Sequence, residues 1–199
     1  MATEQEKFWQ GEFGDEYTER NQGEQILAGN LALFAKILDR TEGITSVLEF
    51  GAGTGNNLRA ITFLLPKCFS VGVEINKKAV QSLAGVANYV IGGSIFDGAE
   101  GYTADLVLSK GLLIHLDPSM LPVAYDTIYN SSTKYICLVE YYNPTPVEVP
   151  YRGHGGKLFK RDFAGEMIDR YGLTLVDYGF VYHRDKFKQD DVHWWLLKK

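Results

Sequence analysis

At 199 residues the chain is long enough for one well-buried domain and too short for two ordinary ones. Its 45% hydrophobic and 23% charged residues are typical of a soluble globular protein, and no apolar run approaches the roughly 20 residues that span a bilayer. The net charge of −5 argues against a nucleic-acid partner, because phosphate contacts need concentrated Lys and Arg. The polar N-terminus is unlike a targeting peptide. We therefore expect a cytoplasmic protein with no membrane partner and a single domain over residues 1–199.

Residues 1–40 are expected to form a helical cap, because aromatic and apolar side chains recur there at helical spacing. From residue 41 onward, short apolar runs alternate with helical stretches, which favours βαβ units and a parallel sheet. The last two predicted strands have no helix between them and indicate an antiparallel hairpin. We expect an α/β, Rossmann-like core with a mostly parallel seven-stranded sheet and a C-terminal antiparallel hairpin. The predicted helices are 25–39, 57–65, 76–84, 117–129 and 161–171, and the predicted strands are 45–50, 69–75, 89–91, 104–109, 135–140, 173–183 and 192–197.

A glycine turn follows the first predicted strand, with Glu49, Gly51, Gly53 and Gly55 at every second position. Glycines there let a ligand approach backbone amides and the N-terminus of the next helix. The third glycine comes one residue earlier than in the dinucleotide-binding fingerprint, which would place it at Asn56. This spacing favours S-adenosylmethionine over NAD. A tight turn without a ligand is the alternative.

Two further strand ends supply candidate contacts to a nucleoside. Glu74 closes the second strand, where a carboxylate can accept hydrogen bonds from both ribose hydroxyls of S-adenosylmethionine or NAD. After the third strand, Ser94 can meet the amino edge of adenine while Ile95 or Phe96 packs on its ring, although an ordinary turn explains these residues equally well. The full set of predicted cofactor-binding residues is Trp9, Tyr17, Asn21, Glu49, Gly51, Gly53, Gly55, Asn56, Glu74, Ile75, Ser94, Ile95, Phe96, Ser109, Lys110 and Gly111.

Candidate catalytic residues follow the fourth and fifth strands. His115 lies where strand ends line the cleft of an open parallel sheet, so it can act as a general base, a hydrogen-bonding group or a packing residue. If the methyl group of S-adenosylmethionine is transferred to a hydroxyl, a base must take the hydroxyl proton. The candidate bases are His115, His154 and Tyr141, in that order. The four histidines lack the spacing of metal ligands, and we expect no metal site.

The connection from residue 140 to residue 161 is chemically rich and carries basic residues within an acidic protein. Guanidinium and ammonium groups in a cleft suit a carboxylate or phosphate on the acceptor, whereas the alternative is a solvated charged loop. The predicted substrate-binding residues are Tyr142, Asn143, Arg152, Lys157 and Arg161.

The chain resembles class I S-adenosylmethionine-dependent methyltransferases over nearly its whole length. More narrowly, it is similar to the pseudaminic acid biosynthesis-associated methylases. The narrower similarity lies in residues 8–21 (FWQGEFGDEYTERN), 47–57 (VLEFGAGTGNN), 140–144 (EYYNP) and 151–154 (YRGH). In methyltransferases an acid at the position of Glu49 orders the glycine turn.

The resemblance implies methyl transfer to an oxygen or nitrogen of a small polar, anionic acceptor, such as a nonulosonic acid or a nucleotide sugar. The acceptor's carboxylate would suit Arg152, Lys157 or Arg161. An NAD-dependent oxidoreductase and a non-catalytic S-adenosylmethionine-binding module are the alternatives. A nucleic-acid methylase fits the charge of the chain less well.

Overall fold

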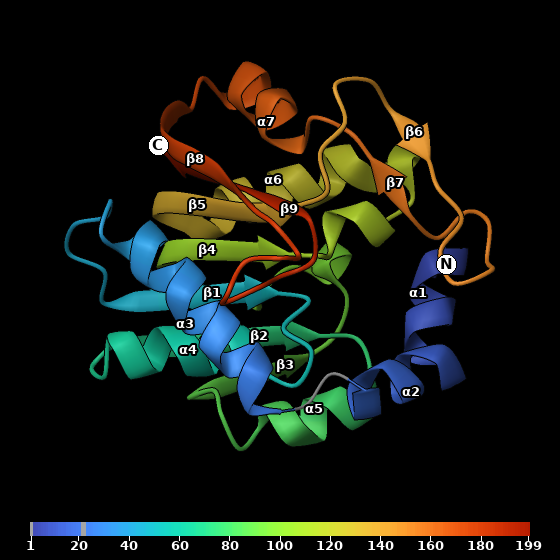
Figure 1. Cartoon of the computed structure of the whole chain (residues 1–199), viewed down its shortest axis with the longest axis horizontal. Helices are drawn as coiled ribbons and strands as arrows, with labels where there is room; N and C mark the ends of the chain where they lie inside the picture. The colour runs from blue at the N-terminus through green and yellow to red at the C-terminus, as the bar shows by residue number, and fades with distance from the viewer. Residues whose placement is uncertain (1, 21–22) are drawn as a thin grey trace.

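A seven-stranded sheet forms the centre of the computed structural model, which describes residues 2–20 and 23–199 (Figure 1). Strands β1 to β5 run parallel, and β9 runs antiparallel to both of its neighbours, β5 and β8. The predicted parallel sheet with a C-terminal antiparallel hairpin is confirmed. The order across the sheet is β3 (Tyr89–Gly92), β2 (Phe69–Glu74), β1 (Ser46–Phe50), β4 (Ala104–Lys110), β5 (Ser132–Glu140), β9 (Val192–Lys198) and β8 (Thr174–Val181).

Helices cover both faces of this sheet, which is why its parallel strands are apolar along nearly their whole length. On one face, Val47 belongs to a buried cluster with α3 (Glu24–Leu38) and α4 (Asn56–Leu64). On the other face, Phe50 packs with α6 (Leu121–Ser131) and α7 (Phe163–Tyr171). The short α5 (Lys77–Leu83) lies against β2 and β3. This arrangement leaves the carboxyl ends of the parallel strands as the open edge of the sheet.

The N-terminal segment is helical, as predicted, but Gly11 divides it into α1 (Glu4–Gln10) and α2 (Glu12–Arg20). The two helices approach closely at Gly14, because a Cβ there would lie 1.9 Å from the Trp9 carbonyl oxygen. The Asn76 side chain, which caps α5, donates to this carbonyl and to the Asp15 carboxylate at 3.1 and 2.9 Å. One amide group therefore ties α1 and α2 to the end of β2.

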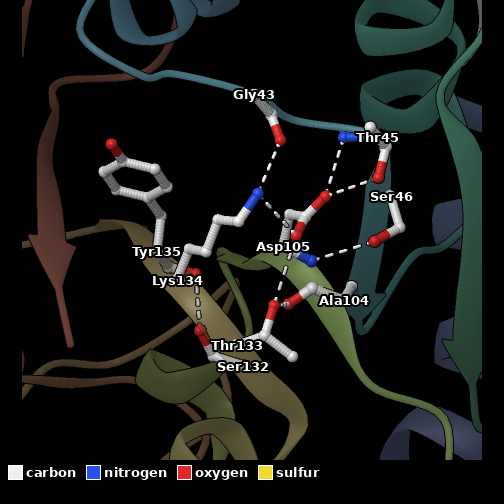
Figure 2. A network of polar contacts seen from close by, with 9 residues as sticks. All are labelled: Gly43, Thr45, Ser46, Ala104, Asp105, Ser132, Thr133, Lys134 and Tyr135. Carbon is white, nitrogen blue, oxygen red and sulfur yellow. Dashed lines mark hydrogen bonds and ion pairs between the residues drawn. The ribbon is translucent and has the colours of Figure 1, made fainter.

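A polar network holds together the starts of β1, β4 and β5, at the edge opposite the open one (Figure 2). The Asp105 carboxylate accepts from the backbone and hydroxyl of Thr45 at 2.8 and 2.7 Å, and the Lys134 ammonium lies 3.1 Å away. The same ammonium donates to the Gly43 carbonyl. These polar residues explain why β5 begins at Ser132, three residues before the apolar run that indicated it.

Other differences from the sequence prediction are local. Residues 147–148 and 159–160 form an unpredicted two-stranded hairpin, β6 (Val147–Glu148) and β7 (Phe159–Lys160). The helix predicted from residue 117 starts as a 3₁₀ turn, η3 (Pro118–Met120), before α6. Two more 3₁₀ turns are η1 (Ile95–Asp97) and η2 (Leu113–His115). Within the described ranges, no helix has both the length and the apolar composition needed to cross a membrane.

Candidate functional site

A pocket opens at the carboxyl ends of β1 to β4, beneath α1 and α2. A second pocket adjoins it along the glycine turn and reaches the loop between β8 and β9. Eleven of the predicted cofactor-binding residues line one or both of these pockets: Trp9, Tyr17, Gly51, Gly53, Asn56, Glu74, Ile75, Ser94, Ile95, Lys110 and Gly111. Glu49, Gly55, Phe96 and Ser109 line neither, and Asn21 lies outside the described residues.

The three glycines of the turn all have positive φ, but each has a different neighbourhood. A Cβ at Gly51 would lie 3.0 Å from Leu112, and one at Gly55 would lie 2.9 Å from Leu83. A Cβ at Gly53 would have no neighbour within 4 Å and would fill part of the pocket. Gly53 therefore leaves space for a ligand against the backbone, as a bound nucleoside cofactor requires.

Glu74 joins the glycine turn to the end of β2. One carboxylate oxygen accepts from the Gly53 amide and the other from the Asn76 amide, both at 2.7 Å. Burial raises the pKa of Glu74, while these backbone amides oppose the shift. An ionised carboxylate has about four acceptor positions, so these two contacts leave it able to accept ribose hydroxyls.

Glu49 lies in the core next to the turn and lines neither pocket. Its side chain is fully buried and accepts from the Asn57 amide at 2.6 Å. Burial raises its pKa to about 8, opposed by the Asn57 hydrogen bond and by the positive charge of Lys110. Since Asn57 lies in the first turn of α4, this contact fixes where the helix begins relative to β1.

Glu140, at the end of β5, shapes the turn that follows β4. One of its oxygens accepts from the Ser109 hydroxyl and from the amides of Leu112 and Leu113, each at 3.1 Å. Burial raises the pKa of this carboxyl to about 7. Ser109 is therefore engaged away from the pocket, whereas the turn that Glu140 holds presents Gly111 to it. This role of Glu140 was not predicted, and the signal for it in the sequence is an acid at the end of a buried strand.

His115 lines the pocket with only 7% of its surface exposed. Its Nδ1 lies 2.6 Å from the Lys157 carbonyl oxygen, which can only accept, so Nδ1 carries the proton and Nε2 is left as an acceptor. The rings of Trp9 and Tyr151 lie 4.7 and 4.8 Å from the imidazole. Burial lowers the pKa of His115 to about 4, so the ring is neutral at pH 7.

The other two candidate bases are placed less favourably. His154 is exposed and packs against Phe8 and Phe13 of the N-terminal helices, outside both pockets. The Tyr141 hydroxyl donates to the Asp190 carboxylate at 3.2 Å. Burial, followed by the charge of Asp190, raises the pKa of Tyr141 well above its usual range, so this phenol is a donor at neutral pH.

The predicted substrate-binding residues are not gathered around either pocket. Arg161 is paired with Glu166 at 2.6 Å, and the Lys157 ammonium lies over the Phe8 ring. The Asn143 amide donates to the Thr145 carbonyl, and Tyr142 packs beside Trp195. Arg152 is exposed in the turn that follows Tyr151. The basic residues expected to act together thus have different neighbours: Tyr151 for Arg152, Phe8 for Lys157 and Glu166 for Arg161.

The pocket also contains polar residues that the sequence analysis missed. Burial acts to raise the pKa of Glu6, but hydrogen bonds with Ser94 and Thr3 outweigh it and lower that pKa. Gln5 donates to the Gly156 carbonyl at 3.0 Å and so connects α1 to the long connection. Among residues 2–20 and 23–199, no group of three or more His, Cys, Asp or Glu side chains is placed to hold a metal ion.

Comparisons with solved structures identify the fold. Magnesium protoporphyrin IX methyltransferase from Synechocystis PCC 6803 with bound SAM superposes with a TM-score of 0.69 at 12% identity, covering 100% of this chain and 98% of that one. A SAM-dependent methyltransferase from Archaeoglobus fulgidus gives 0.69 at 17% identity, covering 94% and 100%. The glycopeptide N-methyltransferase MtfA gives 0.65 at 14% identity, covering 85% and 94%. The chain has the class I methyltransferase fold.

No protein-family model and no curated protein matches the chain. The narrower similarity to pseudaminic acid biosynthesis-associated methylases therefore stays a prediction.

Proposed function

We propose that the chain is a methyltransferase that binds S-adenosylmethionine in the pocket at the carboxyl ends of β1 to β4. The observation that carries this proposal is the joint position of Gly53, Glu74 and Ser94, which lie at or just beyond the ends of three neighbouring parallel strands and line one pocket. Glu74 would accept the ribose hydroxyls, and Ser94 and Ile95 would contact the adenine. Gly53 would leave room for the chain that links the ribose to the amino acid.

S-adenosylmethionine supplies a methyl group that its sulfonium already activates. The protein would contribute position and exclusion of water, which are the main sources of rate for such a displacement. Trp9 and Tyr17, on α1 and α2, line the pocket, where they would help to exclude water from a bound cofactor. The Nε2 atom of His115 is free to accept a hydrogen bond. It would orient or deprotonate the substrate group that receives the methyl.

We propose a small polar acceptor, methylated at oxygen or nitrogen and carrying an anionic group. The acceptor would enter beside Tyr151, whose ring contacts His115. Arg152 follows directly in an exposed turn and is the predicted cation best placed to meet a carboxylate or phosphate there. A nonulosonic acid or a nucleotide sugar has this chemistry.

Calorimetry with S-adenosylhomocysteine and NAD tests the cofactor assignment. The chain is expected to bind S-adenosylhomocysteine and not NAD, and Gly53→Arg is expected to abolish that binding. Gly101→Arg is a matched control, because Gly101 also has positive φ and open space but lies outside the pocket. Unchanged affinity in Gly53→Arg would refute the site, and NAD binding would favour an oxidoreductase.

Labelled S-adenosylmethionine, incubated with the protein and a small-metabolite extract, tests the transfer itself. A labelled product identifies the acceptor and the methylated atom together. His115→Ala is expected to retain S-adenosylhomocysteine binding and to lower turnover. Binding without any labelled product across anionic sugars and nucleotides would favour the non-catalytic module.

A further inference from the structure

A tight turn at residues 151–154 holds an arginine in an unfavourable backbone conformation. The backbones of Tyr151 and His154 exchange two hydrogen bonds, at 2.8 and 2.9 Å, so Arg152 and Gly153 alone make the turn. Both central residues have positive φ, 48° for Arg152 and 87° for Gly153. Two-residue turns of this kind prefer Asn-Gly, because a long side chain is strained at positive φ. Strain of this kind concentrates at active sites and ligand clamps.

The two residues at the base of this turn are fixed to other parts of the site. The Tyr151 ring lies 4.8 Å from the His115 ring and 5.8 Å from the Phe13 ring. The His154 ring lies 5.1 and 5.8 Å from the rings of Phe8 and Phe13. The exposed tip of the turn is therefore held in a definite position, beside a histidine that lines the first pocket.

The guanidinium of Arg152 is available to a ligand. It lies 6.0 Å from the centre of the Tyr151 ring, at the outer limit of a cation–π contact. No carboxylate of residues 2–20 and 23–199 is within ion-pair distance of it, whereas Arg161 is paired with Glu166. Burial raises the pKa of Tyr17 to about 12, and the charge of Arg152 opposes that rise. Since Tyr17 lines both pockets, the guanidinium lies close enough to act on their wall.

Arg152 and His115 lie at different positions along this wall. Burial lowers the pKa of His115 to about 4 and the Lys157 carbonyl opposes the shift, with no contribution from a charged side chain among the described residues. The guanidinium is therefore not beside the imidazole, although both groups contact the Tyr151 ring. A methyl acceptor that reaches both must have its reacting atom at one place and its anionic group at another.

We propose that Arg152 binds the anionic group of the methyl acceptor and selects acceptors in which that group is not the one methylated. The acceptor is then a hydroxyl or amino compound with a separate carboxylate or phosphate, such as a sugar acid or a sugar phosphate. A guanidinium binds either oxyanion through paired hydrogen bonds. The inference rests on the proposed function, because it assigns the substrate class of the same site.

The two ends of such an acceptor have different fates in the transfer. Its reacting oxygen or nitrogen would bond to the methyl carbon as the bond from that carbon to sulfur breaks and leaves its electron pair on the sulfur. The proton of the reacting group would pass to Nε2 of His115 and from there to water. The anionic group would keep its charge on Arg152 throughout.

Three variants separate the strain in the turn from the function of the side chain. Arg152→Asn supplies the preferred turn residue and is expected to raise the midpoint of a thermal melt by about 2–4 °C. Glu100→Asn is the matched control, because Glu100 is the other non-glycine residue with positive φ in the described ranges and lies outside both pockets. It should raise the midpoint as well. Arg152→Lys keeps both the strain and the charge, and it should melt like the unaltered chain.

Labelled S-adenosylmethionine and a dilute small-metabolite extract measure the function of the side chain. Arg152→Asn is expected to lower labelling about tenfold, and a concentrated extract should restore it, because the loss is in binding of the acceptor. Arg152→Lys should lose less, and Glu100→Asn should lose nothing. In calorimetry, the affinity of all three variants for S-adenosylhomocysteine should stay within about twofold of that of the unaltered chain.

The chemistry of the labelled product tests the acceptor class. The product should bind to an anion exchanger and keep its label in alkali, and its mass distinguishes a carboxylate from a phosphate. A neutral product, or one that loses its label in alkali as a methyl ester does, would overturn the inference, because the anion itself would have been methylated.

Two results with Arg152→Asn would also overturn the inference and leave the cofactor assignment standing. One is unchanged labelling in the dilute extract. The other is a lower melting midpoint, which would show that Arg152 stabilises the turn. If the unaltered chain bound no S-adenosylhomocysteine, or bound it and labelled nothing, the proposed function would fail first and the inference with it.

Discussion

The buried imidazole of His115 should make the protein acid-sensitive in a way that one substitution removes. Burial lowers the pKa of His115 from 6.5 to about 4. Between these values the unfolded chain binds a proton that the folded chain does not, so stability is present above pH 6.5 and is lost as the pH falls toward 4. One pKa unit corresponds to about 1.36 kcal/mol. Lowering the pH from 7.5 to 4.5 should therefore reduce the free energy of unfolding by about 3 kcal/mol through this residue.

His115→Asn should remove this dependence while retaining a donor for the Lys157 carbonyl, because the amide Nδ2 can replace the ring Nδ1. The variant should be less stable at pH 7.5, since it loses the ring packing on Trp9 and Tyr151. Between pH 7.5 and 4.5, its free energy of unfolding should fall by about 3 kcal/mol less than that of the unaltered chain. Other titrating groups, including Glu49 and Glu140, are common to both proteins and cancel in the comparison.

Urea unfolding followed by circular dichroism at pH 7.5, 6.0 and 4.5 measures the difference between the two proteins. If the difference in free energy of unfolding between the unaltered chain and the variant narrows steadily as the pH falls, a neutral, buried His115 is supported. Equal losses in both proteins would show that His115 titrates alike in the folded and unfolded states, and burial would then not lower its pKa.

Three further substitutions test two carboxylates, Glu140 at the end of β5 and Asp105 at the start of β4. Glu140→Leu leaves the buried amides of Leu112 and Leu113 without an acceptor and should lower the free energy of unfolding in urea by about 3 kcal/mol or more. Glu140→Gln keeps one acceptor oxygen and should lower it less. Similar losses in the two variants would contradict the hydrogen-bond role. Burial opposes ionisation of Asp105, but hydrogen bonds from Thr45 and Lys134 outweigh it and lower its pKa to about 2. Asp105→Asn should cost about 1 kcal/mol at pH 7, discounted for solvent screening, and the loss should disappear as the pH falls from about 4 to 2; a constant loss would exclude an electrostatic origin.

The sheet and its helices were predictable because their signals are local. Apolar runs of strand length alternate with amphipathic stretches, and most observed boundaries lie within two residues of the expected ones. The exceptions have weak local signals. The β6–β7 hairpin has only two residues in each strand, and β5 begins with polar residues that bond to neighbouring strands.

The residues that line the pockets could be predicted from the sequence only where their position relative to the end of a strand places them there. Gly53, Glu74 and Ser94 lie at or just beyond strand ends, and all three line the first pocket. Arg161 shows the opposite case, because its partner Glu166 becomes evident only when α7 is in place. Asn30 is similar, since it appears as an ordinary polar residue of a helix until the loop between β8 and β9 is seen to cover it.

The glycine turn illustrates what a sequence motif can and cannot say about a ligand. The third glycine, Gly55, stands one residue early for a dinucleotide fold, and a side chain there would collide with Leu83 of α5 and with Val86. Gly51 is likewise constrained by Leu112. Only at Gly53 does the missing side chain leave space in the pocket. The outer two glycines of the motif are therefore explained by packing within the protein, and only the middle one bears directly on a ligand.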